Sequence, residues 1–144
     1  MTKQTRVIAV SNQKGGVAKT TTAINLAASL ALADQRVLLI DMDPQANLTS
    51  GVGLKDQATE AGTIYDALTA TESIVARDFV LPTQIDHLSL VPADRHLTGA
   101  EIELVTLSDR DKRLKRFVDA LRGEYDFIFI DSPPSLGLLT LNAL

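Results

Sequence analysis

The residues with the clearest chemistry form the segment KGGVAKTT at positions 14–21. It follows an apolar run over Val7–Val10 and precedes a stretch whose apolar residues have helical spacing. Gly15 and Gly16 can adopt positive φ and let the backbone approach a ligand closely. Successive backbone N–H groups in such a turn form a concave site for phosphate oxygens, next to the positive N-terminal end of the helix. The segment therefore predicts a nucleotide phosphate site.

Side chains of the same segment provide charge and a metal ligand. Lys19 is a cation for the outer phosphates, and the Thr20 hydroxyl can ligate Mg²⁺, an ion that keeps several waters in such sites. The common pattern G-x-x-x-x-G-K-[ST] has glycine where this chain has Gln13 and Ala18, and a second lysine, Lys14, begins the loop instead. We expect the nucleotide-binding residues to be Lys14, Gly15, Gly16, Val17, Ala18, Lys19, Thr20 and Thr21.

Two carboxylates follow the next apolar run. Arg36–Asp41 has a continuous apolar centre, as expected of a strand in a parallel sheet covered on both faces, and Asp43 lies two residues beyond Asp41. Ligands of open α/β sheets bind at the carboxyl ends of the strands. Alone, the pair is equally well explained as a polar turn, because Pro44 ends the strand. We expect 47–53 to be a polar, glycine-bearing loop that reorders with a γ-phosphate.

A third carboxylate ends the apolar run Tyr125–Asp131. An aspartate at the carboxyl end of an apolar strand is the arrangement of a Walker B motif, in which Asp131 would hold Mg²⁺ through water. Such a string is weak evidence by itself. It becomes strong evidence when a phosphate-binding loop precedes it in the same chain.

These elements predict an α/β fold, a P-loop NTPase-type mostly parallel sheet flanked by helices, with residues 1–144 forming a single P-loop ATPase domain. The predicted strands are 6–10, 36–41, 87–92 and 125–131, and the main helices are 20–32 and the segment between Ser108 and Gly123. Thr63 is predicted to cap a short helix. In the less regular segment 70–86 we expect core contacts from Ile74, Val75, Phe79, Val80 and Leu81.

The composition narrows the class of protein. With 144 residues and 45% hydrophobic residues, the chain fits one domain with a sizeable core. It has no cysteine, which excludes disulfides and iron–sulfur ligation within the chain. No apolar run approaches the length of a membrane span and no signal-peptide pattern is seen, so we expect a cytoplasmic location. A net charge of −4 gives no global attraction to DNA.

Together the motifs resemble the ParA/MinD family of deviant Walker A ATPases, and most of the chain resembles the ParA/Soj-type partition ATPases. The family patterns are K-G-G-x-G-K-T, D-x-D-P-Q and D-x-P-P-S-L-G, which 14–20, 41–45 and 131–137 match except at Ala18. By this resemblance Lys14 crosses a dimer interface to the partner's nucleotide, and Asp43 positions or activates the attacking water. The implied catalytic residues are Lys14, Lys19 and Asp43, and the implied Mg²⁺ residues are Thr20, Asp41 and Asp131.

The resemblance implies an ATP-dependent dimerising switch for chromosome or plasmid partitioning, which hydrolyses ATP to ADP and phosphate with Mg²⁺. The implied partners are a second copy in the ATP-bound state, a ParB-type centromere-binding protein and non-specific DNA, which would associate the complete protein with the nucleoid. The apolar helical pattern from Leu138 stops at Leu144, so we expect the chain to be the N-terminal part of the fold, C-terminally truncated. Such a fragment would leave the edge of a central strand unpaired and be weakly active or inactive.

Other functions remain open at this point. A MinD-like positioning ATPase would need a C-terminal amphipathic membrane helix, for which the sequence to Leu144 gives no test. A small-molecule P-loop ligase or kinase would use the same phosphate loop. Ala18 leaves open a regulator that binds nucleotide without hydrolysing it. A nitrogenase iron protein is excluded, because its cluster needs cysteines.

Overall fold

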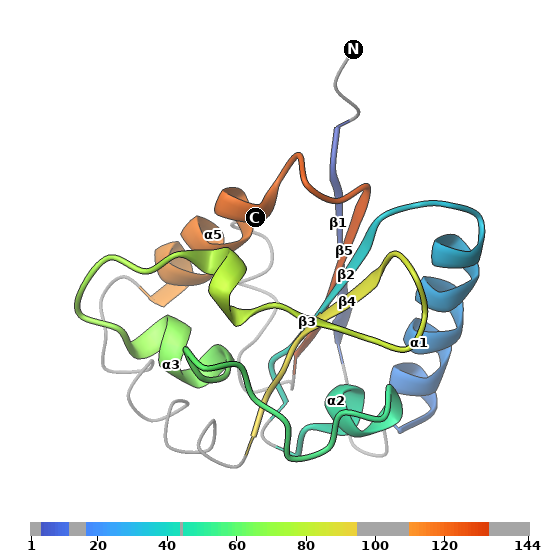
Figure 1. Ribbon diagram of the computed structural model, residues 1–144, viewed down its shortest axis with the longest axis horizontal. Helices are drawn as coiled ribbons and strands as arrows, with labels where there is room; N and C mark the ends of the chain where they lie inside the picture. Colours follow the sequence, from blue (N-terminus) through green and yellow to red (C-terminus); the bar gives the residue numbers. More distant parts are fainter. Residues whose placement is uncertain (1–3, 12–16, 44, 95–109, 133–144) are drawn as a thin grey trace.

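Figure 1 shows the computed structural model, in which a central sheet has helices on both faces. The structure describes residues 4–11, 17–43, 45–94 and 110–132. The strands are β1 (Arg6–Ser11), β2 (Val37–Asp41), β3 (Leu81–Pro82), β4 (Leu88–Val91) and β5 (Phe127–Ser132). The helices are α1 (Val17–Leu32), α2 (Asn47–Gly51), α3 (Ile64–Thr69), the 3₁₀ helix η1 (Ala76–Phe79) and α5 (Arg110–Leu121).

The strand order is β1-β5-β2-β4-β3, and every pair is parallel except β3 with β4. This confirms the predicted mostly parallel sheet. In the register, Asp131 of β5 lies between Val10 of β1 and Asp41 of β2. Because parallel strands end at the same edge of a sheet, the predicted acidic positions are brought together there.

Two apolar cores cover the sheet, one on each face. Alternate residues of β2 enter opposite cores: Leu38 and Ile40 pack toward α3 and α5, while Val37 and Leu39 pack toward α1 and α2. A strand buried on both faces must be apolar throughout, which is why its sequence is a continuous run. The predicted apolar stripe of α5 is confirmed, since its four members are all buried: Leu114, Phe117, Val118 and Leu121.

Among the connecting segments, the predicted loop 47–53 and the predicted core positions of Ile74 and Val75 were wrong. The predicted loop 47–53 contains helix α2, whose Leu48 is fully buried in the core beneath α1. Ile74 and Val75 are 39% and 61% exposed rather than core residues, because residues 70–75 run over the surface outside any helix or strand. Phe79 does enter the core, from the unpredicted η1. Thr63 precedes α3 as predicted, and its backbone N–H donates to Asp66 Oδ2 at 2.9 Å.

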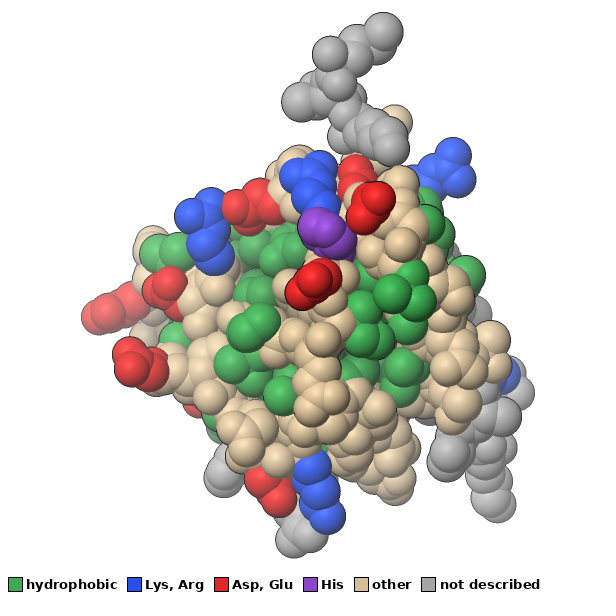
Figure 2. Space-filling view, turned by 45° about the vertical axis from the view of Figure 1, so that its right-hand side comes forward, with side chains coloured by type: hydrophobic (Ala, Val, Ile, Leu, Met, Phe, Trp, Pro, Cys, Tyr) green, Lys and Arg blue, Asp and Glu red, His purple; other side chains and the backbone are tan. Residues whose placement is uncertain are grey.

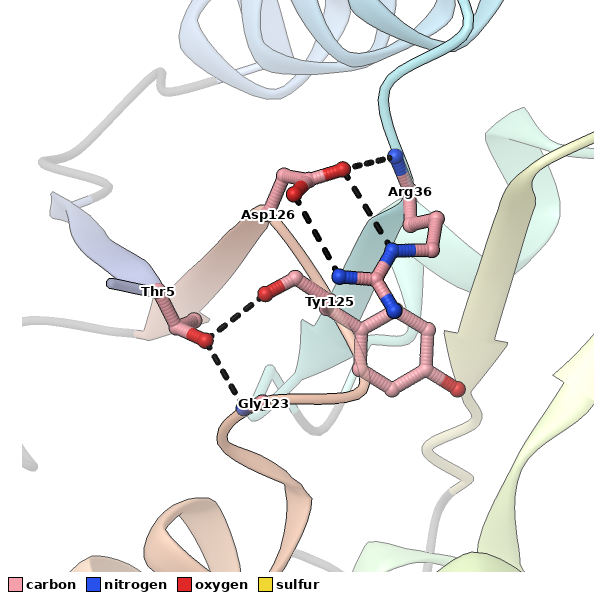
Figure 3. Close-up of polar contacts among 5 residues, drawn as sticks. All are labelled: Thr5, Arg36, Gly123, Tyr125 and Asp126. Atoms are coloured by element: carbon pink, nitrogen blue, oxygen red, sulfur yellow. Dashed lines mark hydrogen bonds and ion pairs between the residues drawn. The ribbon is translucent and has the colours of Figure 1, made fainter. Parts of the chain in front are cut away.

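Hydrogen bonds at the amino end of the sheet join β1, β2 and β5 (Figure 3). The Thr5 hydroxyl donates to the carbonyl oxygen of Tyr125 at 2.7 Å and accepts from the backbone N–H of Gly123 at 2.9 Å. Gly123 has φ +90°, the left-handed conformation that commonly follows the end of a helix. The backbone N–H of Arg36 donates to Asp126 Oδ2 at 2.8 Å, and its guanidinium pairs with the same carboxylate. This end of the sheet is therefore fixed by bonds between residues far apart in sequence.

Replacing Thr5 by valine should lower the free energy of unfolding by about 1–3 kcal/mol, because the Gly123 N–H and the Tyr125 carbonyl both lose a partly buried partner. Urea denaturation measures the change. Thr5→Ser, which keeps the hydroxyl, is the control and should stay close to the parent protein. Equal stability of the valine and serine variants would show that these two bonds do not contribute.

Candidate functional site

The candidate site lies where the amino end of α1 meets the carboxyl ends of β1, β5 and β2. Helix α1 begins at Val17, three residues before the predicted start at Thr20, so Lys19 and Thr20 belong to its first turn. Ala18 is also helical, in a conformation that alanine favours, so its backbone does not require the glycine of the family pattern. Lys14, Gly15 and Gly16 lie outside the described residues, and so do the side chains of Val17 and Ala18.

A buried hydrogen bond joins the two halves of the predicted site. The Thr20 hydroxyl donates to Asp131 Oδ2 at 2.9 Å, across 111 positions of sequence, and the two residues are only 3% and 1% exposed. The backbone N–H of Met42 donates to the Asp131 carbonyl oxygen at 2.7 Å, which ties the end of β2 to the end of β5. Lys19 and Thr21, on the same turn as Thr20, are exposed. The structure thus brings together Thr20 and Asp131, which the sequence motifs assigned to one metal site.

Asp41 is fully buried at the end of β2 and accepts hydrogen bonds on both oxygens. The Asp43 N–H donates to Oδ1 at 3.0 Å, and the Thr49 N–H and hydroxyl donate to Oδ2 at 2.9 and 2.7 Å. Burial raises the pKa of Asp41 from its ordinary value of 3.8 to about 7, the bonds from Thr49 and Asp43 oppose this rise, and the charge of Asp131 adds to it. A carboxyl group in this setting favours its neutral form unless a cation stands nearby.

Asp43 is held at the turn that leads into α2. Its Oδ1 accepts the Gln45 N–H at 2.9 Å and its Oδ2 accepts the Asn47 side-chain amide at 3.3 Å. Ala46 adopts φ +56°, which redirects the chain into the helix. Asp43 is 9% exposed and lies beside the buried pair of Asp41 and Asp131. All three predicted carboxylates are therefore at one edge of the sheet.

The oxygen atoms gathered at this edge of the sheet fit a hard divalent cation that is coordinated by both protein and phosphate oxygens. Buried carboxylate oxygens from Asp41 and Asp131 and the Thr20 hydroxyl are the oxygen ligands that Mg²⁺ prefers. Within the described ranges, no group of three or more His, Cys, Asp or Glu residues is placed to hold a metal by itself.

Comparison with known proteins places this chain in a family. A family model described as an AAA domain matches residues 5–144. The chain is 58% identical to the chromosome partitioning protein ParA of Myxococcus xanthus (strain DK1622) over 139 residues, 96% of this chain and 48% of that protein. It is 50% identical to the sporulation initiation inhibitor protein Soj of Bacillus subtilis (strain 168), over 96% of this chain and 54% of that protein.

The chain belongs to the ParA/Soj family of partition ATPases. It spans about half the length of these two relatives. A solved structure described as cobyrinic acid a,c-diamide synthase from Mycobacterium smegmatis, with a bound ATP analogue and magnesium, superposes with a TM-score of 0.83 at 41% identity. The match covers 97% of this chain and 56% of that one. The P-loop NTPase-type fold predicted for this ParA/Soj-family chain is confirmed.

Sequence reasoning missed two residues of the site, Thr49 and Asn47. Thr49 is fully buried and bonds to Asp41, and Asn47 bonds to Asp43. In the sequence they belong to a polar stretch, NLTSG, with no spacing that marks one hydroxyl or amide as special. Only the position of α2 against the sheet distinguishes them from the exposed Ser50 and Gly51 of the same helix.

The burial of Asp41 predicts a pH-dependent stability in the absence of metal and nucleotide. Between pH 3.8 and about 7 the folded state keeps a proton that the unfolded state has released, so the free energy of unfolding should fall as the pH rises through this window and level off above it. The contribution of this one group is on the order of 4 kcal/mol over the whole window.

Urea denaturation of the parent protein and of Asp41→Asn, from pH 4 to pH 8, isolates the contribution of Asp41 to the pH dependence of the free energy of unfolding. Asparagine cannot titrate but keeps one side-chain oxygen for the Thr49 hydroxyl. The stability of the parent relative to the variant should decrease with rising pH. Two curves that stay parallel across the range would contradict the assignment of the titration to Asp41.

Proposed function

We propose that residues 1–144 form a P-loop ATPase domain whose full-length protein is an ATP-dependent switch for chromosome or plasmid partitioning, hydrolysing ATP to ADP and phosphate. The observation that carries the proposal is the buried bond between Thr20 and Asp131. It joins the hydroxyl of the phosphate-loop motif to the carboxylate of the Walker B motif, the two groups that such a site needs on one ion. The similarity to ParA and Soj favours partitioning as the process that the switch serves.

In the proposed site, backbone N–H groups of 14–21 and the amino end of α1 bind the phosphates. Lys19, on the first turn of α1, neutralises charge on the outer phosphates. Thr20, Asp131 and the neighbouring Asp41 would hold Mg²⁺, which supplies electrostatic stabilisation of the transferring phosphoryl group. Asp43 would orient the attacking water, and its bonds to Gln45 and Asn47 fix its carboxylate for that task.

Lys14 is proposed to couple nucleotide binding to dimerisation. A lysine that reaches across an interface can bind the partner's phosphates only when nucleotide is present, so ATP would favour the dimer and hydrolysis would release it. This role comes from the family's loop pattern, in which Lys14 is the first lysine.

DNA and a ParB-type protein are proposed as partners of the full-length protein. Figure 2 shows acidic and basic side chains interspersed on the face it displays, which agrees with the net charge of −4. Non-specific DNA binding needs clustered positive charge, which summing two copies of this net-negative chain does not supply, so DNA binding by the dimer is proposed from the partition-protein relatives. Among the described helices, none is long and apolar enough to cross a membrane. The proposed location is the cytoplasm, in association with the nucleoid.

Lys14→Ala should abolish ATP-dependent dimerisation of the full-length protein, because the partner's phosphates lose the cation that crosses the interface. Analytical ultracentrifugation with and without Mg-ATP measures the change. Lys55→Ala, at an exposed loop lysine, is the matched control and should dimerise like the parent. An unchanged dimer in the Lys14 variant would refute the crossing role.

Thr20→Val should weaken Mg²⁺-assisted binding of a non-hydrolysable ATP analogue about 10- to 100-fold, because the metal loses one oxygen ligand and Asp131 loses one hydrogen-bond donor. Calorimetric titration with and without Mg²⁺ separates this effect from metal-independent binding. Thr20→Ser keeps the hydroxyl and should retain the Mg²⁺ effect. If Mg²⁺ tightens binding equally in the valine variant and the parent, the metal does not use Thr20.

A second candidate is a small-molecule ligase or kinase that uses the same phosphate site. The observation that favours it is the 41% identity to the structure described as cobyrinic acid a,c-diamide synthase. ADP release separates the two candidates. A partition ATPase should be stimulated by DNA together with a ParB-type partner, whereas a ligase or kinase should release ADP only with its small-molecule acceptor.

A further inference from the structure

Thr49 occupies a position that connects three separate segments of the site. Its hydroxyl donates to Asp41 Oδ2 at 2.7 Å and accepts from the Ala93 N–H at 3.1 Å, and its own N–H donates to the same Asp41 oxygen. Thr49 and Asp41 are fully buried, and Ala93 is 2% exposed. A single hydroxyl thus ties α2 both to the end of β2 and to the chain that follows β4.

The connection continues from Asp41 to the residue proposed to orient water. The other oxygen of Asp41 accepts the backbone N–H of Asp43 at 3.0 Å. Asp43 in turn holds Asn47, at the start of α2, through its own carboxylate. Hydrogen bonds thus link Thr49 to Asp41, Asp41 to Asp43 and Asp43 to Asn47, and the backbone of α2 joins Asn47 to Thr49. The position of the Asp43 carboxylate therefore depends on where α2 lies against the sheet.

Removing one partner of a buried hydrogen bond costs free energy, because the other partner is left unsatisfied. Removing the Thr49 hydroxyl leaves the Ala93 N–H without its acceptor and Asp41 with one donor fewer, in a place that water does not reach. The remaining contacts would let α2 shift relative to β2, and Asp43 with it. Displacements of about 1 Å in catalytic groups can reduce a rate about a hundredfold.

We propose that Thr49 is a positioning residue: through Asp41 and Ala93 it locks α2 against the sheet and thereby sets the Asp43 carboxylate for hydrolysis. This inference rests on the proposed ATPase function and adds to it. It predicts a specific kinetic signature, since the described hydrogen bonds of Thr49 join it to Asp41 and Ala93. Loss of the hydroxyl should lower kcat and leave nucleotide affinity measured without Mg²⁺ nearly unchanged, because Asp41 is itself a proposed Mg²⁺ residue.

The test compares Thr49→Val with Thr49→Ser in the full-length protein. Valine keeps the shape and removes the hydroxyl, and serine restores the hydroxyl. We expect kcat of the valine variant to fall about tenfold to a hundredfold, with affinity for a non-hydrolysable ATP analogue, measured without Mg²⁺, within about twofold of the parent, and the serine variant to regain most of the rate. Ser50→Ala, at the exposed next position of α2, is the control and should change neither quantity.

Amide hydrogen exchange on the nucleotide-free proteins provides a readout that needs no turnover. The amides of Asp43, Thr49 and Ala93 should exchange faster in Thr49→Val and at the parental rate in Thr49→Ser. If the valine variant does not fold, Thr49→Ala is used with the same measurements. A folded variant without the hydroxyl that keeps the parental kcat, or the parental exchange at Asp43, overturns the proposal.

The two measurements also distinguish this proposal from the proposed function. If the parent protein hydrolyses no ATP, the ATPase function fails and so does a positioning role in it, while the exchange data still report whether Thr49 holds α2. If the parent hydrolyses ATP and the valine variant only unfolds at lower temperature with unchanged kcat, the ATPase function stands and Thr49 is merely structural.

Discussion

The hydrogen bond from the Thr20 hydroxyl to Asp131 is the contact on which the arrangement of this molecule depends. It holds the first turn of α1 against the end of β5, and β5 lies between β1 and β2 in the sheet. Both partners are almost completely buried, as are Asp41 and Thr49, so the bond fixes one pair within a buried polar group at this edge of the sheet. Elements from opposite ends of the chain must fold together before it can form, because its partners are 111 residues apart.

Two neighbouring buried carboxylates at the same edge of the sheet are electrostatically unfavourable. The register sets Asp41 directly beside Asp131, and both carboxylates are removed from water. Hydrogen bonds from Thr49 and Asp43 stabilise the charge on Asp41 only in part, since burial still raises its pKa to about 7. A divalent cation close to these carboxylates would offset this cost, which gives the proposed Mg²⁺ a physical reason to bind here. With Mg²⁺ bound as proposed, the site would be more stable than without it.

Much of the fold could be predicted from the sequence because its strongest signals are local. The run Val37–Ile40 must be apolar to be buried on both faces, and the stripe on α5 has the period of a helix. The meeting of Thr20 and Asp131 followed from topology, since motifs that end parallel strands share one edge. Helix α2 could not be predicted, because only Leu48 among its five residues is an apolar anchor. Ile74 and Val75 were wrongly predicted to be core residues for the opposite reason: they are apolar, but the structure leaves them exposed. The bonds of Thr49 arise from tertiary packing, which no spacing in the sequence encodes.

The central claim is that the turn between β1 and α1 binds a nucleotide triphosphate together with Mg²⁺. The most direct test is a crystal structure of the full-length protein grown with a saturating non-hydrolysable ATP analogue and Mg²⁺. The account predicts phosphate oxygens at the amino end of α1 and a metal ion in contact with the Thr20 hydroxyl and close to Asp131. A structure in which that turn is empty, or in which the nucleotide binds elsewhere, would contradict it.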